Sequence, residues 1–172
     1  MNRFTLTPLT RRFSTAICVA MLTTLAACAM GPKQAFHGFS FDGKSDRWAT
    51  QVDLLEYSYG DQYRMVRDKV QPPKERLGPQ SSVFGAMPIG EFLFVKWRIK
   101  ATGEVIEDRV DLRNLLPSDM EKYKVTFVID GKQLHVFLVT PKAKHEYDPP
   151  ILKTTESRYL VTREIYPVNT HK

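Results

Sequence analysis

The sequence predicts an all-β protein, either an antiparallel β-sandwich or an open barrel of about six to seven strands. Two observations support this class. From Phe36 onward the apolar residues recur with a period of two, and Gly, Pro, Asn and Asp separate the alternating segments. No amphipathic helix of about ten residues is present. Strands joined mainly by short turns within one domain fit both architectures, and we expect the sandwich.

Two hairpins give the strongest patterns. The segment 91–99 places Leu93, Val95, Trp97 and Ile99 on one face and Lys96 and Arg98 on the other. A turn at 101–104 leads into a second alternating run at 105–112. The segments 123–129 and 134–140 predict another hairpin, because Asp130-Gly131 offers the positive backbone dihedrals of a tight turn. The continuous apolar run 136–139 predicts a strand covered on both faces.

Other elements are expected before and after these hairpins. Strands are predicted at 48–59 and 62–70, joined at Gly60-Asp61, and at 158–166. One helical turn is predicted at 115–121. The prolines of 71–82 cannot bond within a ladder, so this segment is predicted to be a loop. The segment 85–90 is read as a bent strand entry with Pro88 at a sheet edge.

The first 27 residues have the order of a secretory signal. Three arginines and no acidic residue precede an apolar stretch at 13–25, which is shorter than the roughly 20 residues of a membrane span. We therefore predict a cleaved signal peptide at 1–27, a tether at 28–35 and a single β domain at 36–172.

The end of that signal, Leu25-Ala26-Ala27-Cys28, resembles the lipobox of bacterial lipoproteins. The resemblance implies cleavage before Cys28, diacylglycerol on its thiol and an acyl chain such as palmitate on its new amino group. Several acyl chains anchor a protein almost permanently. Ala29 in the next position favours the outer membrane, on the periplasmic side, in a cell with two membranes. The alternative is a plain secretory cleavage site with an unmodified cysteine.

The charge and the cysteines narrow the classes of partner. The chain carries a net charge of +6, but three basic residues lie in the signal, which leaves 22 basic and 19 acidic residues and a net charge of +3. The charges alternate in short mixed runs, so no nucleic-acid partner is expected. Only Cys18 and Cys28 are present. Because Cys18 lies in the predicted signal and Cys28 is expected to carry lipid, the β domain is expected to have no thiol available for a disulfide.

No constellation for catalysis or metal binding is apparent. The histidines His37, His135, His145 and His171 are far apart, and none lies in a tight pair with another ligand. Glu107 and Asp108 would point to opposite faces of a strand, and 85–90 lacks the lysine and helix of a phosphate loop. We therefore expect no enzyme, no cofactor and no metal.

A group of tyrosines and arginines is the candidate for binding a partner. Tyr57, Tyr59 and Tyr63 surround Gly60, and Tyr and Arg are side chains that protein interfaces favour. The residues chosen as partner contacts are Tyr59, Tyr63, Arg64 and Arg76, with Arg67 nearby. The alternative is that Tyr57 and Tyr59 share one face and line the core.

The stretch Met87 to Arg98, with Thr102-Gly103-Glu104, Val110-Asp111-Leu112 and Leu115-Leu116-Pro117, resembles small uncharacterised periplasmic lipoproteins, some found beside antibacterial type VI secretion effectors. The resemblance implies a protein-binding module that acts as an immunity factor against a secreted toxin. The alternatives are a structural or assembly lipoprotein of an envelope or secretion machine, and a carrier of an apolar ligand. A core filled by Trp48, Trp97, Phe127 and Phe137 would exclude the carrier.

Overall fold

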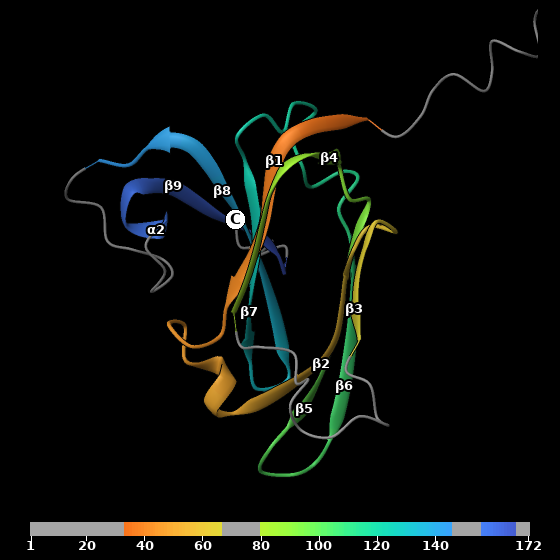
Figure 1. Cartoon of the computed structure of the whole chain (residues 1–172). Coiled ribbons are helices and arrows are strands. Elements are labelled where there is room, and N and C mark those ends of the chain that lie inside the picture. Colours follow the sequence, from red (N-terminus) through yellow and green to blue (C-terminus); the bar gives the residue numbers. More distant parts are fainter. Residues whose placement is uncertain (1–32, 67–79, 146–155, 168–172) are drawn as a thin grey trace, which may run out of the picture. The chain divides into compact units, whose positions relative to one another are not determined.

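Two β-sheets form the fold in the computed structural model, which describes residues 33–66, 80–145 and 156–167 (Figure 1). The five-stranded sheet has the order β4 (Gln80–Pro88), β1 (Gln34–Asp42), β7 (Lys124–Asp130), β8 (Gln133–Ala143) and β9 (Leu160–Tyr166). The four-stranded sheet has the order β3 (Tyr63–Val66), β2 (Val52–Tyr59), β5 (Phe92–Ile99) and β6 (Val105–Asp111). One core cluster takes side chains from both sheets, so the predicted all-β sandwich is confirmed.

The three predicted hairpins are confirmed. β2 pairs with β3, β5 with β6 and β7 with β8, each antiparallel, and each turn contains a glycine with positive φ, namely Gly60, Gly103 and Gly131. Since Asp130 still pairs with Gln133, the last turn consists of Gly131 and Lys132 rather than Asp130 and Gly131. Neighbouring segments therefore pair as their local pattern indicates.

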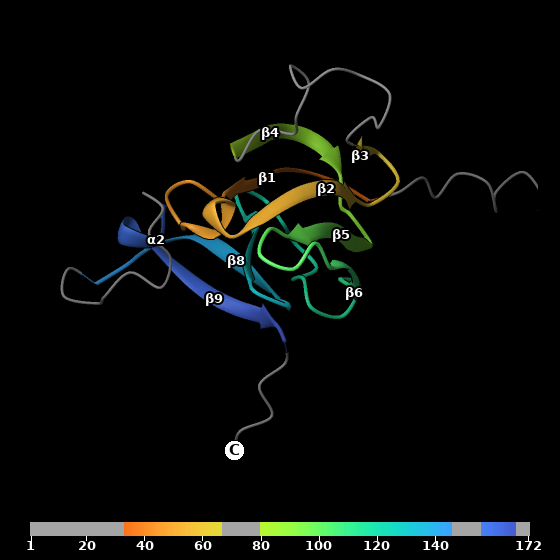
Figure 2. The ribbon, with the colours of Figure 1, turned by 90° about the horizontal axis from the view of Figure 1, so that it is seen from below.

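The sequence reading missed two strands, so the described residues hold nine rather than six or seven. β1 begins at Gln34, inside the predicted tether. β4 covers 80–88, which was read partly as loop and partly as a bent strand entry. β4 is an edge strand of the five-stranded sheet, as Figures 1 and 2 show, and it carries no continuous apolar face. β4 is a strand because its backbone pairs with β1, although its own residues show no strand pattern.

Smaller corrections concern element ends and strand direction. Residues 48–50 form a 3-10 turn (η1, Trp48–Thr50), residues 156–159 form a short helix (α2, Glu156–Tyr159), and 115–121 contains no helix. β1 runs parallel to β7 over three residue pairs, so the sandwich is not purely antiparallel. The prediction that the 136–139 run is covered on both faces is confirmed, since all four of its residues are buried. Residues 67–70 of the predicted second strand lie outside the described residues.

Aromatic rings fill the space between the sheets. Phe41 stacks on Phe127 with ring centroids 4.9 Å apart, and Trp48 lies 5.9 Å from the same ring. Trp97 is fully buried and donates its indole N–H to the Gly131 carbonyl oxygen at 3.0 Å. Phe137 is buried but lies outside this cluster, because it shares the outer face of its sheet with its partners on β7 and β9. The other three rings occupy the place where a carrier would hold its ligand.

A β-bulge decides which way the β2 tyrosines point. Leu54 pairs with Trp97 and Glu56 with Lys96, so Leu55 is an extra residue in the ladder. Val52 and Leu54 face the core before the bulge, and Tyr57 and Tyr59 face it afterwards. The interpretation that both tyrosines line the core is confirmed.

Tyr59 joins the two sheets through a polar contact inside the core. His37 of β1 is fully buried, and its Nδ1 lies 3.0 Å from the carbonyl oxygen of Ala35, which can only accept a proton. In the neutral ring Nδ1 therefore donates, and Nε2 accepts from the Tyr59 hydroxyl at 2.9 Å. The backbone N–H of Gly90 donates to the same hydroxyl oxygen. Each polar atom of this buried chain is thus paired, which a low-dielectric core requires.

We expect Tyr59→Phe to lower the free energy of unfolding by about 1–3 kcal/mol, because His37 Nε2 and the Gly90 N–H lose their partner inside the core. Urea denaturation measures the effect. Tyr57→Phe is the matched control on the same face of the same strand, since its hydroxyl makes only a 3.4 Å contact with Ser81. Equal losses in the two variants would contradict the role given to the Tyr59 hydroxyl.

Stability should also decline at alkaline pH. Burial raises the pKa of Tyr59 to about 12, against the opposing effect of the Gly90 hydrogen bond. The unfolded chain releases this proton near pH 10, so the stabilisation is complete below about pH 10 and is lost as the pH rises toward 12. Urea unfolding across this range should fall less steeply in Tyr59→Phe than in the parent chain, and parallel declines would refute the assignment.

Candidate functional site

Two phenylalanines lie on the solvent side of the four-stranded sheet. Along β5, Leu93, Val95 and Trp97 are fully buried against the core. Phe92 and Phe94 alternate with them and are only partly buried, on the outer face with Lys96 and Arg98. Aromatic side chains on the outer face of an otherwise charged sheet indicate a contact surface.

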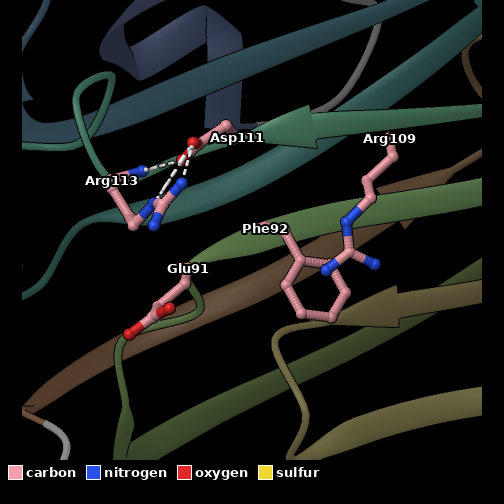
Figure 3. A pocket seen from close by; sticks show the side chains of 5 residues that line it. All are labelled: Glu91, Phe92, Arg109, Asp111 and Arg113. Carbon is pink, nitrogen blue, oxygen red and sulfur yellow. Dashed lines mark hydrogen bonds and ion pairs between the residues drawn. The ribbon is translucent and has the colours of Figure 1, made fainter.

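Arg109 of β6 covers one of these rings. Its Cζ lies 3.5 Å from the centroid of the Phe92 ring, and Figure 3 shows the guanidinium above that ring. The β5–β6 register, in which Phe94 faces Arg109 and Phe92 faces Asp111, places the two side chains diagonally across the ladder. A cation–π contact at an exposed position contributes about 0.5–1 kcal/mol. No hydrogen bond or ion pair to Arg109 occurs among the described residues.

Two shallow hollows meet at Phe92 and Arg109. We call them, together with the residues between them, the Arg109 surface. The hollow of about 220 Å³ is lined by Glu91, Phe92, Arg109, Asp111 and Arg113. The hollow of about 300 Å³ is lined by Glu56, Ser58, Gly60, Asp61, Arg64, Phe92, Phe94 and Arg109. Both are at or below the lower limit of about 300 Å³ for small-molecule pockets, which suits contact with a broad surface better than enclosure of a small ligand.

Ion pairs hold the charges around Arg109 in place. Arg64 Nε lies 2.9 Å from Glu56 Oε1 across the β2–β3 ladder. Arg113 bonds both carboxylate oxygens of Asp111, and these hydrogen bonds lower the pKa of Asp111 to about 2. The same contact raises the pKa of Arg113. The surface therefore presents both signs of charge around one aromatic centre.

The structure brings together only part of the predicted site. Tyr59 is wrong as a partner contact, because it is fully buried and belongs to the core. Tyr63 is partly buried and packs against the core cluster. Arg64 is exposed and lines the larger hollow, and its role as a partner contact stays a prediction. Arg76, with Arg67, lies outside the described residues, as does Cys28.

The sequence reading missed Phe92 and Arg109. A signal for Phe92 was present, since Phe92 and Phe94 fall on the same face as Lys96 and Arg98 in the alternating pattern. Arg109 carried no such signal. Its position over Phe92 depends on the β5–β6 register, which places one strand's side chains against the other's.

The carboxylates Glu107 and Asp108 point to opposite faces of β6, as predicted. Glu107 accepts a hydrogen bond from Lys96 Nζ at 2.9 Å on the outer face. Asp108 accepts one from the Tyr166 hydroxyl of β9 at 2.9 Å, and burial together with this carboxylate raises the pKa of Tyr166. The Asp108–Tyr166 contact thus ties the two sheets at a second point.

Clusters of metal ligands and membrane-spanning helices are absent from the described part of the chain. There, no three His, Cys, Asp or Glu side chains converge as metal ligands. His135 lies on the outer face of the five-stranded sheet, 2.5 Å from Glu164. Among the same residues, no helix has the length and apolar character needed to cross a bilayer.

No family model matches the chain, and no curated protein or solved structure is significantly similar to it. The Arg109 surface is the feature of the described residues that combines partly exposed aromatic rings, an arginine without a bonded partner among those residues and a concave shape.

We expect Arg113→Gln to raise the pKa of Asp111 from about 2 toward its ordinary value of about 3.9, because the guanidinium that bonds the carboxylate is removed. The folded-state pKa is depressed, so the contact is present above about pH 4 and is lost as the pH falls through 2. Carboxyl carbon-13 NMR measures the titration. Arg64→Gln is the control and should leave Asp111 unchanged, and an unaltered pKa in Arg113→Gln would contradict the assignment.

Proposed function

We propose that this chain is a lipoprotein, anchored through Cys28 at the bacterial outer membrane, that binds another protein in the periplasm as an immunity factor against a secreted antibacterial toxin. The anchoring part rests on the resemblance of 25–28 to a lipobox and on the apolar signal before it. The binding part rests on the Arg109 surface. No catalytic step is assigned to the chain.

The chemistry of the Arg109 surface favours a protein as its ligand. Interfaces are enriched in aromatic residues and arginine, and a few such side chains carry most of the binding energy. Phe92 and Phe94 supply apolar area that water now contacts, and Arg109 adds donors for carbonyl or carboxylate oxygens. The single observation that carries the proposal is the guanidinium of Arg109, which lies 3.5 Å from the centroid of the Phe92 ring and has no hydrogen bond or ion pair to another described residue.

The framework under this surface is rigid, which tight binding requires. The strands that carry Phe92 and Arg109 pair over seven consecutive residue pairs, and their inner faces are packed into the core. The ion pairs of Arg64 and Arg113 limit the motion of the rim. Little ordering entropy would therefore be lost when a partner binds.

Cys28→Ser should abolish lipid attachment, because serine offers no thiol for the diacylglycerol. We expect the variant to keep the mass of the uncleaved precursor. We also expect it to be lost from the lipid-anchored protein that detergent extracts from membranes. Mass spectrometry and flotation of cell membranes measure the two effects. A variant that has the mass of the parent protein, apart from the exchange of sulfur for oxygen, and still floats with the membranes would refute the anchoring.

Protection against a toxin tests the binding role. A secreted toxin encoded beside this gene is expressed in the periplasm of a susceptible host, with and without this chain. We expect growth to be restored by the parent chain and lost with Phe92→Ala combined with Arg109→Ala, since two central anchors are removed. Loss of about 2 kcal/mol weakens binding roughly thirtyfold for each side chain, and roughly a thousandfold for the double variant where the two losses add.

Lys132→Ala is the control for that experiment, because Lys132 pairs with Glu104 on the surface away from the two hollows. It should protect as well as the parent chain, and circular dichroism should show that all variants are folded. Equal killing with and without the parent chain would rule out the immunity role. Equal protection by the double variant would place the contact elsewhere on the chain.

A further inference from the structure

A second exposed aromatic pair lies on the other sheet. Phe36 of β1 is 44% exposed and Phe84 of β4 is 50% exposed, and their rings meet edge to face with centroids 5.0 Å apart. They account for two of the four large hydrophobic side chains that are exposed among the described residues. Both point away from the core, because their strand neighbours His37, Phe39 and Met87 face inward or are buried.

The backbone beneath this Phe36–Phe84 pair fixes its position. Phe84 lies opposite Gly38 in the β1–β4 ladder. A Cβ on Gly38 would come within 2.5 Å of Phe84 Cδ2, so the ring lies directly over the glycine backbone. The absence of a side chain at Gly38 thus lets Phe84 lie against Phe36 while half of each ring remains in water. Two joined rings at the rim of a sheet form an apolar patch without a partner in the described structure.

Two lysines lie beside the pair. Lys122 donates its backbone N–H to the Phe36 carbonyl oxygen at 2.7 Å, and the Cγ of Lys124 lies 3.1 Å from the Cβ position of Gly38. One carboxylate is close, since Glu121 Oε2 accepts the Phe36 N–H at 3.2 Å. Lysine side chains beside an apolar patch suit a surface of anionic lipid headgroups.

The chain length between the patch and Cys28 points to the occupant. Phe36 follows Cys28 by eight residues, which span at most about 26–29 Å even when fully extended. A lipid on Cys28 would therefore keep the Phe36–Phe84 pair within that distance of the bilayer surface. Aromatic rings flanked by lysines are favoured at the boundary between headgroups and acyl chains.

We propose that the Phe36–Phe84 pair contacts the bilayer in which the Cys28 lipid is inserted, with Lys122 and Lys124 beside the headgroups. The inference rests on the lipid attachment proposed above, but not on the identity of any protein partner. It orients the domain, because the pair and the Arg109 surface lie on the outer faces of different sheets. The five-stranded sheet would face the lipid at this corner and leave the Arg109 surface open to the periplasm.

Site-specific fluorescence tests the orientation. Cys28 is acylated in the lipidated chain and no other cysteine follows it, so an introduced cysteine is the sole free thiol. One label is placed at Ser82→Cys, which is exposed two residues from Phe84, and one at Glu107→Cys on the outer face of the other sheet. The lipidated protein is inserted into phosphatidylethanolamine–phosphatidylglycerol vesicles that carry nitroxide-labelled acyl chains.

We expect the nitroxide lipids to quench the label at position 82 more strongly than the label at position 107. Phe36→Ser combined with Phe84→Ser should abolish this difference while the protein still floats with the vesicles. Val105→Ser is the matched control, since it removes an exposed apolar side chain from the other sheet and should leave the difference intact. Circular dichroism checks that each variant is folded.

The outcomes separate this proposal from the proposed anchoring. Flotation with equal quenching at both positions, or a difference that survives the double serine variant, overturns the membrane contact and leaves the anchor standing. A chain that does not float overturns the anchor. In that case a hexahistidine segment replaces Cys28, tethers the same chain to nickel-chelating lipids, and decides the membrane contact by the same two labels.

Discussion

The hydrogen bond between Tyr59 and His37 is the constraint on which the arrangement of the two sheets depends. It joins β2 of one sheet to β1 of the other inside the core, at 2.9 Å. The Tyr59 ring also stacks on Phe39 at 5.1 Å, and a Cβ on Gly90 would come within 2.6 Å of it. A polar pair in this position tolerates little sliding of one sheet over the other, because any shift would leave buried donors and acceptors unpaired. The Tyr166–Asp108 contact restrains the sheets at another point.

Since the inner faces are filled by aromatic and aliphatic side chains, the surfaces available for function lie on the outer faces. The four-stranded sheet presents Phe92 under Arg109, with ion pairs on either side. The five-stranded sheet presents Phe36 against Phe84, with Lys124 beside them. The two patches differ in chemistry. The first offers the directional N–H donors of Arg109 together with an aromatic ring. The second offers an apolar patch with positive charge nearby. We propose a protein ligand for the first and a lipid surface for the second on this difference.

The candidate site was only partly predictable, and each failure has a structural reason. The pattern placed Tyr57 and Tyr59 on one face, but it could not show the bulge at Leu55 that directs this face to the core. Arg64 was predicted from its position beside the Gly60 turn and lies where a partner could reach it. Arg109 could not be found, because its contact with Phe92 arises from the register of two strands rather than from its own neighbours in the sequence.

By itself, the sequence determined the β class and the three hairpins, whereas the signal peptide at 1–27 stays a prediction. Period-two alternation and glycine turns involve residues that are close in the chain, so the local sequence is sufficient to predict them. Only the tertiary structure decided that 80–88 is a strand, that β1 lies between β4 and β7, and that Phe36 meets Phe84. Those features join segments far apart in sequence. They are set by which partner satisfies the backbone groups of a strand and fills the core, and no local pattern encodes that choice.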